Sequence, residues 1–424
     1  MTLNRREFIK WMSAGAGVAA VAGCAGTGGG TSAGRVVVIG AGYGGATAAK
    51  YIRMWAPDIE VTLVERNGEF ISCPISNLVL GGSKTLADIT VGYGGLGKYG
   101  VKMVRDDAIA VDPVKREVRL ASGATLGYDR LIVSPGIDFM YETIPGLNNA
   151  AAQERVLHAW KAGAQTVALR KQLEAMRDGG VYAIHIPRAP YRCPPGPYER
   201  ACQVAYYFKT AKPKSKVLIL DANEDVVSKK GLFMAAWNGP YKGMVEYHPN
   251  SEIVDVDVKT LTAKLQFDNV KADVLNVVPP HGAGTIARQT GLITANNRWC
   301  GIDWLTMESI KVKGIHVLGD ATLSAPAMPK SGHIANQHAK VCAAAVIALI
   351  KNQPVNTQPM MVNTCYSFID DKNVVHVASV HVYDPAQKTM VAVKGSGGLS
   401  DKANELEGTY AWGWARNIWA DMLA

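Results

Sequence analysis

The stretch Arg35-Val36-Val37-Val38-Ile39-Gly40-Ala41-Gly42-Tyr43-Gly44-Gly45 decides the fold of this chain. Its apolar run predicts a buried parallel strand, which leads directly into a glycine-rich loop and then into an alanine-rich helix. The glycines, among them Gly40, Gly42 and Gly45, allow the tight turn, let backbone N–H groups approach a pyrophosphate and permit close packing of the helix, whose N-terminus adds partial positive charge. The stretch therefore predicts a dinucleotide-binding unit.

The residues that follow strengthen this interpretation. Residues 60–64 predict a second strand, and this strand ends on Glu65 and Arg66. An acidic residue at this point of such a unit binds the ribose of the dinucleotide. A lone Gly-x-Gly-x-x-Gly is a weak signal, but strand, glycine loop, helix, strand and acid in this order are a strong one.

Two later strands indicate that the dinucleotide is FAD. The strand predicted at 128–136 ends in the small residues Pro135 and Gly136, and the strand predicted at 314–321 ends in Gly-Asp320. This second ending resembles the strand whose aspartate meets the ribityl chain of the flavin in flavoproteins with two dinucleotide-binding domains. Asp320 could also cap a helix, and the two roles could coexist.

A predicted helix after Asp320 adds a further flavin contact. Lys330 and Ser331 lie just before this helix, which continues to about Ile350. A helix start aimed at the flavin pyrimidine would stabilise negative charge on the reduced ring, and we expect Lys330 to contribute to this effect.

A second unit with the order strand, loop, helix and strand lies between about 150 and 270. Its loop, residues 187–197, contains Cys193, several prolines and only one glycine. Proline has no N–H to donate to a pyrophosphate, so we expect no binding of NAD(P)H by this unit.

The patterns together predict the α/β fold class, with two Rossmann-like dinucleotide-binding-type domains (FAD/NAD(P)-type) plus a C-terminal α+β domain. The predicted parts are a signal and tether at 1–34, an FAD-binding domain at 35–150 plus 271–355, a second, degenerate NAD-type domain at 151–270, and a C-terminal interface domain at 356–424.

The N-terminal residues predict export. Arg5-Arg6 precedes an apolar run of small residues, which is typical of a twin-arginine signal, a route that carries folded proteins. We therefore expect a periplasmic protein. Val21-Ala-Gly-Cys24 also resembles a lipobox, so a lipid anchor on Cys24 and simple cleavage before about residue 34 both stay open.

Composition and charge exclude other classes of protein. The net charge is +9, but the Lys and Arg residues are scattered, so we expect no nucleic-acid binding. The chain has no Cys-x-x-Cys-His and no cysteines at zinc spacing, so we expect neither covalent haem nor a metal site on it. The tryptophans at 412, 414 and 419 could form a membrane-interface helix, a partner interface or simple packing.

The most specific motifs are Cys193-Pro-Pro-Gly-Pro-Tyr-Glu199, Asn363-Thr-Cys365-Tyr366, Pro329-Lys-Ser-Gly332 and Trp412-Gly-Trp414. Through them the whole chain resembles the flavoprotein subunit of flavocytochrome c sulfide dehydrogenase, a relative of sulfide:quinone oxidoreductases and disulfide reductases.

The resemblance implies a set of roles. Cys193 and Cys365 would form a redox-active disulfide beside FAD, and Cys73 would carry the flavin through an 8α-S-cysteinyl bond, although Pro74 follows it where an aromatic residue is expected. Glu199 is the candidate proton carrier, with a solvated helix-start glutamate as the alternative. Trp414 would form a wall of the sulfide pocket.

The implied activity is oxidation of hydrosulfide to sulfur or polysulfide. Electrons would pass to a c-type cytochrome subunit in a heterodimer, and the haem c would be on that partner only. The alternatives are a sulfide:quinone oxidoreductase and a non-catalytic flavoprotein that carries persulfide sulfur.

Overall fold

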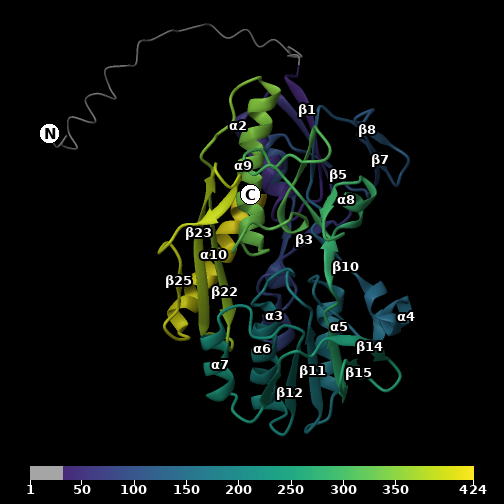
Figure 1. Cartoon of the computed structure of the whole chain (residues 1–424), viewed down its shortest axis with the longest axis vertical. Coiled ribbons are helices and arrows are strands. Elements are labelled where there is room, and N and C mark those ends of the chain that lie inside the picture. The colour runs from purple at the N-terminus through teal and green to yellow at the C-terminus, as the bar shows by residue number, and fades with distance from the viewer. Residues whose placement is uncertain (1–31) are drawn as a thin grey trace, which may run out of the picture. The chain divides into compact units, whose positions relative to one another are not determined.

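The computed structural model describes residues 32–424. The predicted twin-arginine signal, with Arg5, Arg6 and Cys24, lies outside the described residues. Figure 1 shows the described part as parallel strands covered by helices, together with an antiparallel sheet formed by the C-terminal residues.

The first sheet is parallel and contains the strand predicted at 35–39. Its order is β21-β9-β1-β2-β5, and β1 pairs with β2 from Gly34↔Ile59 to Ile39↔Val64. Its elements are β1 (Gly34–Ile39), α2 (Gly45–Trp55), β2 (Ile59–Val64), β5 (Lys102–Val104), β9 (Arg130–Val133), β21 (Ile315–Val317) and α9 (Gly332–Ile350).

The second sheet is also parallel, in the order β13-β12-β11-β17. Its elements are α5 (Ala164–Ala175), β11 (Val181–Ile186), α6 (Gly196–Ala211), β12 (Lys216–Asp221), α7 (Lys230–Asn238), β13 (Val245–His248) and β17 (Val274–Val277). The predicted domain boundary at 270 falls too early, because β17 pairs with β11 and completes this sheet.

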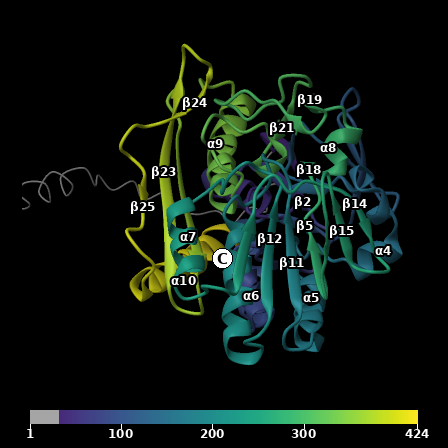
Figure 2. The ribbon, with the colours of Figure 1, turned by 60° about the horizontal axis from the view of Figure 1, so that its bottom comes forward.

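The C-terminal sheet is antiparallel. It contains β22 (Met360–Phe368), β23 (Val374–Asp384), β24 (Thr389–Ala392) and β25 (Gly398–Leu399), and it is followed by α10 (Glu405–Leu423). Figure 2 shows α10 beside β22 and β23. The two parallel sheets and this third sheet confirm the predicted fold class.

Shorter elements connect the sheets. They are β3 (Glu69–Ile71), α3 (Ser76–Gly81), β4 (Thr90–Gly92), β6 (Ala108–Asp112), β7 (Glu117–Leu120), β8 (Thr125–Gly127), β10 (Ile137–Phe139), α4 (Ala150–Arg155), β14 (Ile253–Asp257), β15 (Thr262–Leu265), β16 (Asn269–Lys271), β18 (His281–Ala283), α8 (Thr285–Gln289), β19 (Ile293–Ala295) and β20 (Trp299–Cys300).

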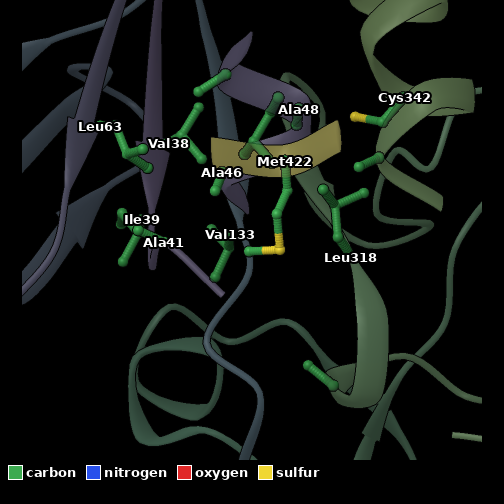
Figure 3. Packing of buried hydrophobic residues seen from close by; sticks show 14 of the residues in the cluster. Val38, Ile39, Ala41, Ala46, Ala48, Leu63, Val133, Leu318, Cys342 and Met422 are labelled. Atoms are coloured by element: carbon green, nitrogen blue, oxygen red, sulfur yellow. The ribbon is translucent and has the colours of Figure 1, made fainter. Parts of the chain in front are cut away.

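The C-terminal helix belongs to the core of the first domain. Met422 lies among Val38, Leu63 and Val133 in a cluster of buried apolar side chains (Figure 3). Trp419 is also buried, and its Nε1 donates to the hydroxyl of Tyr43 at 3.2 Å. These contacts support packing as the role of Trp419.

Candidate active site

One cavity of about 1030 Å³ gathers residues from all three regions of the described chain. A cavity of this size can hold a dinucleotide. Its lining includes most of the predicted site residues, namely Gly40, Gly42, Glu65, Arg66, Cys73, Pro135, Gly136, Cys193, Glu199, Asp320, Ser331, Cys365 and Trp414. Gly45 and Lys330 are predicted site residues that do not line it.

The three glycines predicted as site residues at the β1–α2 junction have separate roles. Gly40 has a φ of +91°, a conformation that favours glycine. A β-carbon on Gly42 would meet no heavy atom within 4 Å, so the backbone there faces open cavity. A β-carbon on Gly45 would lie 1.8 Å from the carbonyl oxygen of Gly40, so Gly45 lets the helix pack against the loop.

Glu65, at the end of β2, lines the cavity and also supports this loop. Its Oε2 accepts the N–H of Ala41 at 2.8 Å, and its Oε1 accepts the N–H of Asn67 at 2.9 Å. Arg66 pairs with Asp107 at 3.0 Å in an exposed position. The hydrogen bonds from Ala41 and Asn67 therefore fix the Glu65 carboxylate at the edge of the cavity.

Asp320 presents an unsatisfied acceptor in the cavity. Its Oδ1 is buried without a hydrogen-bond partner among the described residues, and burial raises the pKa of this carboxyl. Buried polar atoms are almost always paired, so this oxygen indicates a missing donor such as a ligand hydroxyl. Together with the open backbone at Gly42, it shows that the residues present fit FAD.

Lys330 lies outside the lining of the cavity, and its role toward the flavin stays a prediction. Its Nζ is buried, donates to the carbonyl oxygens of Asp320 (2.9 Å) and Thr322, and lies 3.7 Å from the ring centroid of Trp299. Burial lowers the pKa of this ammonium to about 7. Its backbone carbonyl accepts the N–H of Cys193 at 2.9 Å, so Lys330 joins the Asp320 segment to the Cys193 loop.

Cys193 and Cys365 are brought to the same cavity although they are far apart in sequence. Cys193 has a φ of +59° in the proline-rich loop, and Cys365 lies on β22. Burial raises the pKa of the Cys193 thiol, and the neighbouring Cys365 raises it further. Both residues carry free thiols in the structure, so the disulfide implied by the resemblance is not formed there.

Glu199 is buried in the first turn of α6, so the alternative of a solvated helix-start glutamate is wrong. Its Oε1 accepts the N–H of Phe368 at 2.9 Å, and its Oε2 accepts Nδ2 of Asn77 at 3.0 Å. Burial raises the pKa of this carboxyl, as a proton carrier near neutral pH requires.

Trp414 lines the cavity near Cys365. Its ring centroid lies 6.4 Å from that of Tyr366 and 5.9 Å from that of His333. Its Nε1 is buried and has no partner among the described residues. The side chain is therefore placed to bound a small substrate.

Cys73 lines the same cavity after β3. Its sulfur accepts the N–H of Ala162 at 3.4 Å, and two residues later Ile75 has a φ of +74°. The remaining thiols at Cys202, Cys300 and Cys342 are buried and do not line the cavity.

Two buried cations beside the cysteines are absent from the predicted set. The Arg200 guanidinium donates to the carbonyl oxygens of His158 (2.8 Å) and Ala159 (2.7 Å). Lys229 lies behind Cys365 and donates to the carbonyl oxygen of that residue at 2.7 Å. A sequence pattern does not distinguish a buried Arg or Lys from an exposed one, so neither Arg200 nor Lys229 could be identified as a site residue.

The second parallel sheet has no free acid at its nucleotide position. Asp221 ends β12, where a ribose-binding acid is expected, but it is fully buried. Its Oδ2 accepts the hydroxyls of Tyr198 (2.7 Å) and Tyr247 (3.1 Å), and its Oδ1 accepts Nδ2 of Asn223 (2.7 Å). The hydroxyls of the two tyrosines and the amide of Asn223 therefore already bind the carboxylate oxygens that would accept the hydroxyls of a ribose.

Three family models match this chain. A model described as pyridine nucleotide-disulphide oxidoreductase matches residues 34–175. The central region of the sulfide dehydrogenase [flavocytochrome c] flavoprotein chain matches residues 166–279, and the flavin-binding region of flavocytochrome c sulphide dehydrogenase matches residues 357–423.

Individual relatives agree with these models. The sulfide dehydrogenase [flavocytochrome c] flavoprotein chain of Chlorobaculum thiosulfatiphilum is 58% identical over 45 residues, which are 11% of this chain and 94% of that sequence. The mitochondrial sulfide:quinone oxidoreductase of Mus musculus is 23% identical over 305 residues, 68% of this chain and 65% of the relative, so slightly less than two thirds of that relative is covered.

One relative is named for a different reaction, and one solved structure shares the name sulfide:quinone oxidoreductase. The NADH oxidase of Enterococcus faecalis is 30% identical over 169 residues, 37% of each sequence. The solved structure of the sulfide:quinone oxidoreductase from Aquifex aeolicus has a TM-score of 0.75 at 18% identity, and the match covers 92% of this chain and 91% of that one. The structural likeness shows a shared fold.

Proposed function

The chain belongs to the family of sulfide-oxidising flavoproteins that contains flavocytochrome c sulfide dehydrogenase and sulfide:quinone oxidoreductase, and from this premise we propose that it oxidises hydrosulfide through Cys193, Cys365 and FAD. The observation that carries the proposal is the presence of both cysteines in the cavity that holds the dinucleotide-type glycine loop.

The oxidised pair would react with hydrosulfide by thiol–disulfide exchange. Hydrosulfide attacks one sulfur of the Cys193–Cys365 disulfide, the bond between the two cysteines breaks, and a persulfide and a thiolate result; the hydrogen stays on the persulfide. Conversion of hydrosulfide to sulfur releases one proton and two electrons in all. Glu199, buried beside the pair with a raised pKa, accepts the proton. When bound, FAD supplies the acceptor for the two electrons.

The flavin would be held by the residues that fit it. The open Gly42 backbone would hold the pyrophosphate, Glu65 would hold the ribose, and the unsatisfied Asp320 oxygen would accept a hydroxyl of the ribityl chain. We propose a covalent bond from Cys73, because its thiol lines the same cavity. The test is the intact mass of the denatured protein with peptide mapping; flavin on a peptide without Cys73 contradicts the assignment.

The electron acceptor that we propose is a c-type cytochrome subunit in a heterodimer, with the haem on that subunit. The support is the match to two regions of the flavocytochrome c flavoprotein chain. A quinone is the second candidate, supported by the relatives named sulfide:quinone oxidoreductase. Among the described helices, α9 has the length and composition of a membrane span, but more than half of its apolar window is buried in the molecule.

One experiment separates the acceptors. Sulfide is added to the purified flavoprotein with either oxidised cytochrome c or a soluble short-chain quinone. Flavin bleaching followed by haem reduction supports the cytochrome, and turnover with the quinone only supports the second candidate. Flavin that is not bleached by sulfide supports the third possibility, a persulfide carrier without catalysis. The matched variants are Cys193→Ala, which should abolish bleaching, and Cys342→Ala, a buried cysteine outside the cavity, which should not.

We propose that NAD(P)H is not a substrate, although NADH oxidases occur among the relatives. The support is the proline-rich loop before α6 and the occupation of Asp221 by Tyr198 and Tyr247. Anaerobic addition of NADH to the oxidised protein tests this, and flavin bleaching by NADH would contradict it.

We also propose export to the periplasm through the twin-arginine route, from the pair Arg5-Arg6. Replacement of both residues by lysine should leave the protein in the cytoplasmic fraction. The mass of the N-terminal peptide from exported protein distinguishes a lipid on Cys24 from simple cleavage.

A further inference from the structure

Lys229 is a buried cation directly behind Cys365. Lys229 is 5% exposed, and it directly precedes α7 in the second domain. Its Nζ donates to the carbonyl oxygen of Cys365 at 2.7 Å, to Oγ of Ser367 at 2.8 Å and to the carbonyl oxygen of Val375 at 3.3 Å. The ammonium is therefore fixed against the strand that carries the cysteine.

The partners of this ammonium are all neutral. Within the described part of the chain, no carboxylate forms an ion pair with it within 4.0 Å. The charged or titratable groups that face it are Cys365, Glu199 on α6, Cys193 and Glu407 on α10. A buried charge held only by neutral oxygens is costly unless an anion forms nearby.

The two cysteine sulfurs have different surroundings. The amide of Asn363 faces the sulfur of Cys365, with Nδ2 at 3.4 Å and Oδ1 at 3.5 Å, and Oδ1 also accepts the hydroxyl of Ser331 at 2.7 Å. Within residues 32–424 the sulfur of Cys193 has no hydrogen bond. Burial raises the pKa of the Cys365 thiol, whereas Lys229 and Asn363 act to lower it, because a nearby cation and an N–H donor both favour a thiolate over a thiol.

We propose that Lys229 is a positioning residue that holds Cys365 as the thiolate of the pair, so that hydrosulfide attacks Cys193 and Cys365 is the sulfur that leaves. The bond between the two cysteine sulfurs breaks, a new bond joins Cys193 to the incoming sulfur, and the electron pair of the broken bond stays on Cys365. The claim that hydrosulfide attacks Cys193 rests on the proposed sulfide oxidation. The claim that Lys229 favours a thiolate at Cys365 does not depend on it.

The test measures thiolate formation at each cysteine in the reduced holoprotein. Iodoacetamide is applied briefly at a series of pH values, and the labelled peptides of Cys365 and Cys193 are quantified by mass spectrometry. The pH midpoint of labelling is used because it reports thiolate formation independently of access. In the unaltered protein we expect a lower midpoint for Cys365 than for Cys193, and the reverse order would overturn the proposal.

The variant Lys229→Met should raise the Cys365 midpoint by about one pH unit or more, equivalent to about a tenfold loss of thiolate at a fixed pH below the midpoint. The control is Lys230→Met, the same substitution one residue later, where the side chain is exposed and pairs with Asp225 at 2.6 Å. An unchanged Cys365 midpoint in folded Lys229→Met protein contradicts the proposal. If that variant does not fold, the order of midpoints in the unaltered protein decides.

The labelling experiment needs no sulfide, so it fails separately from the proposed function. If the protein oxidises sulfide but the labelling midpoints of Cys365 and Cys193 are equal, the role of Lys229 is refuted and the proposed function stands. A low Cys365 midpoint that depends on Lys229, in a protein that sulfide does not reduce, keeps the thiolate site and refutes the function.

Discussion

Two glycine-to-alanine substitutions at the β1–α2 junction should have separate effects. Gly45→Ala should weaken folding, and Gly42→Ala should weaken FAD binding. At Gly45 the new β-carbon would lie 1.8 Å from the carbonyl oxygen of Gly40. Nonbonded carbon and oxygen atoms stay about 3.3 Å or more apart, so the loop or the helix must move by about 1.5 Å. Because the obstacle is backbone, we expect Gly45→Ala to lower the free energy of unfolding by about 3 kcal/mol.

At Gly42 the same methyl group meets no protein atom within 4 Å. We expect the free energy of unfolding of Gly42→Ala apoprotein to stay within about 0.5 kcal/mol of that of the parent. The methyl group enters the cavity where the pyrophosphate would approach the backbone, so FAD should bind about tenfold more weakly or worse, about 1.4 kcal/mol.

Both variants are made in a Cys73→Ala chain, which removes any covalent bond to the flavin. Thermal unfolding followed by circular dichroism gives the stability of the apoproteins, and titration with FAD gives the affinity. We expect a melting temperature at least about 5 °C lower for Gly45→Ala. The reasoning is refuted if Gly42→Ala binds FAD as tightly as the parent, or if Gly45→Ala melts at the parent's temperature.

Three other predictions follow from buried polar groups. Glu199→Gln should slow sulfide oxidation about 100-fold, since it removes the proton acceptor, while Glu174→Gln on an exposed face should not; equal rates in stopped-flow bleaching would exclude Glu199. Tyr198→Phe should lower the free energy of unfolding by about 1–3 kcal/mol in urea titrations, because Asp221 loses a buried donor, and it should not create NADH-dependent bleaching. The free energy of unfolding should fall as the pH drops from about 6.5 towards 4, because burial lowers the pKa of several histidines in the folded protein. In this pH range the unfolded chain binds more protons than the folded one, so each such histidine lowers the free energy of unfolding by up to about 1.4 kcal/mol per pH unit. Carboxyls with a raised pKa oppose this fall but are fewer, so urea midpoints should be lower at pH 5 than at pH 7, and equal midpoints would contradict it. The histidines are His158, His185, His281, His316, His333, His338 and His381, and the carboxyls are those of Glu199, Asp221 and Asp320.

The elements that sequence predicts well are those determined by short-range patterns. The strand at 35–39 became β1, the following helix ends at Trp55 as expected, and the helix after Ser331 ends at Ile350. Each has an apolar period or run next to glycine or a cap residue, so its limits depend on neighbouring residues.

The failures depend on contacts between distant residues. The boundary at 270 separated β17 from its sheet, because its partner β11 lies about ninety positions earlier. The sequence also does not show that backbone carbonyls and the ring of Trp299 hold the ammonium of Lys330. The sequence does not indicate that Lys229 is buried, because the next residue, Lys230, has the same side chain and is exposed. The burial of a lysine depends on which strand covers it.

The proline-rich loop is more than a nucleotide loop without its glycines. Its Cys193 N–H is bound by the carbonyl of Lys330 from the first domain, and Glu199, just after it, binds the N–H of Phe368 from the C-terminal sheet. A loop that cradled a pyrophosphate would need its own N–H groups, such as that of Cys193, free and pointing at the ligand. The hydrogen bond from the Cys193 N–H to the Lys330 carbonyl therefore supports the proposal that this loop binds no nicotinamide dinucleotide. The contacts that build the dithiol site are themselves the reason to expect electrons from a sulfur nucleophile rather than from a hydride donor.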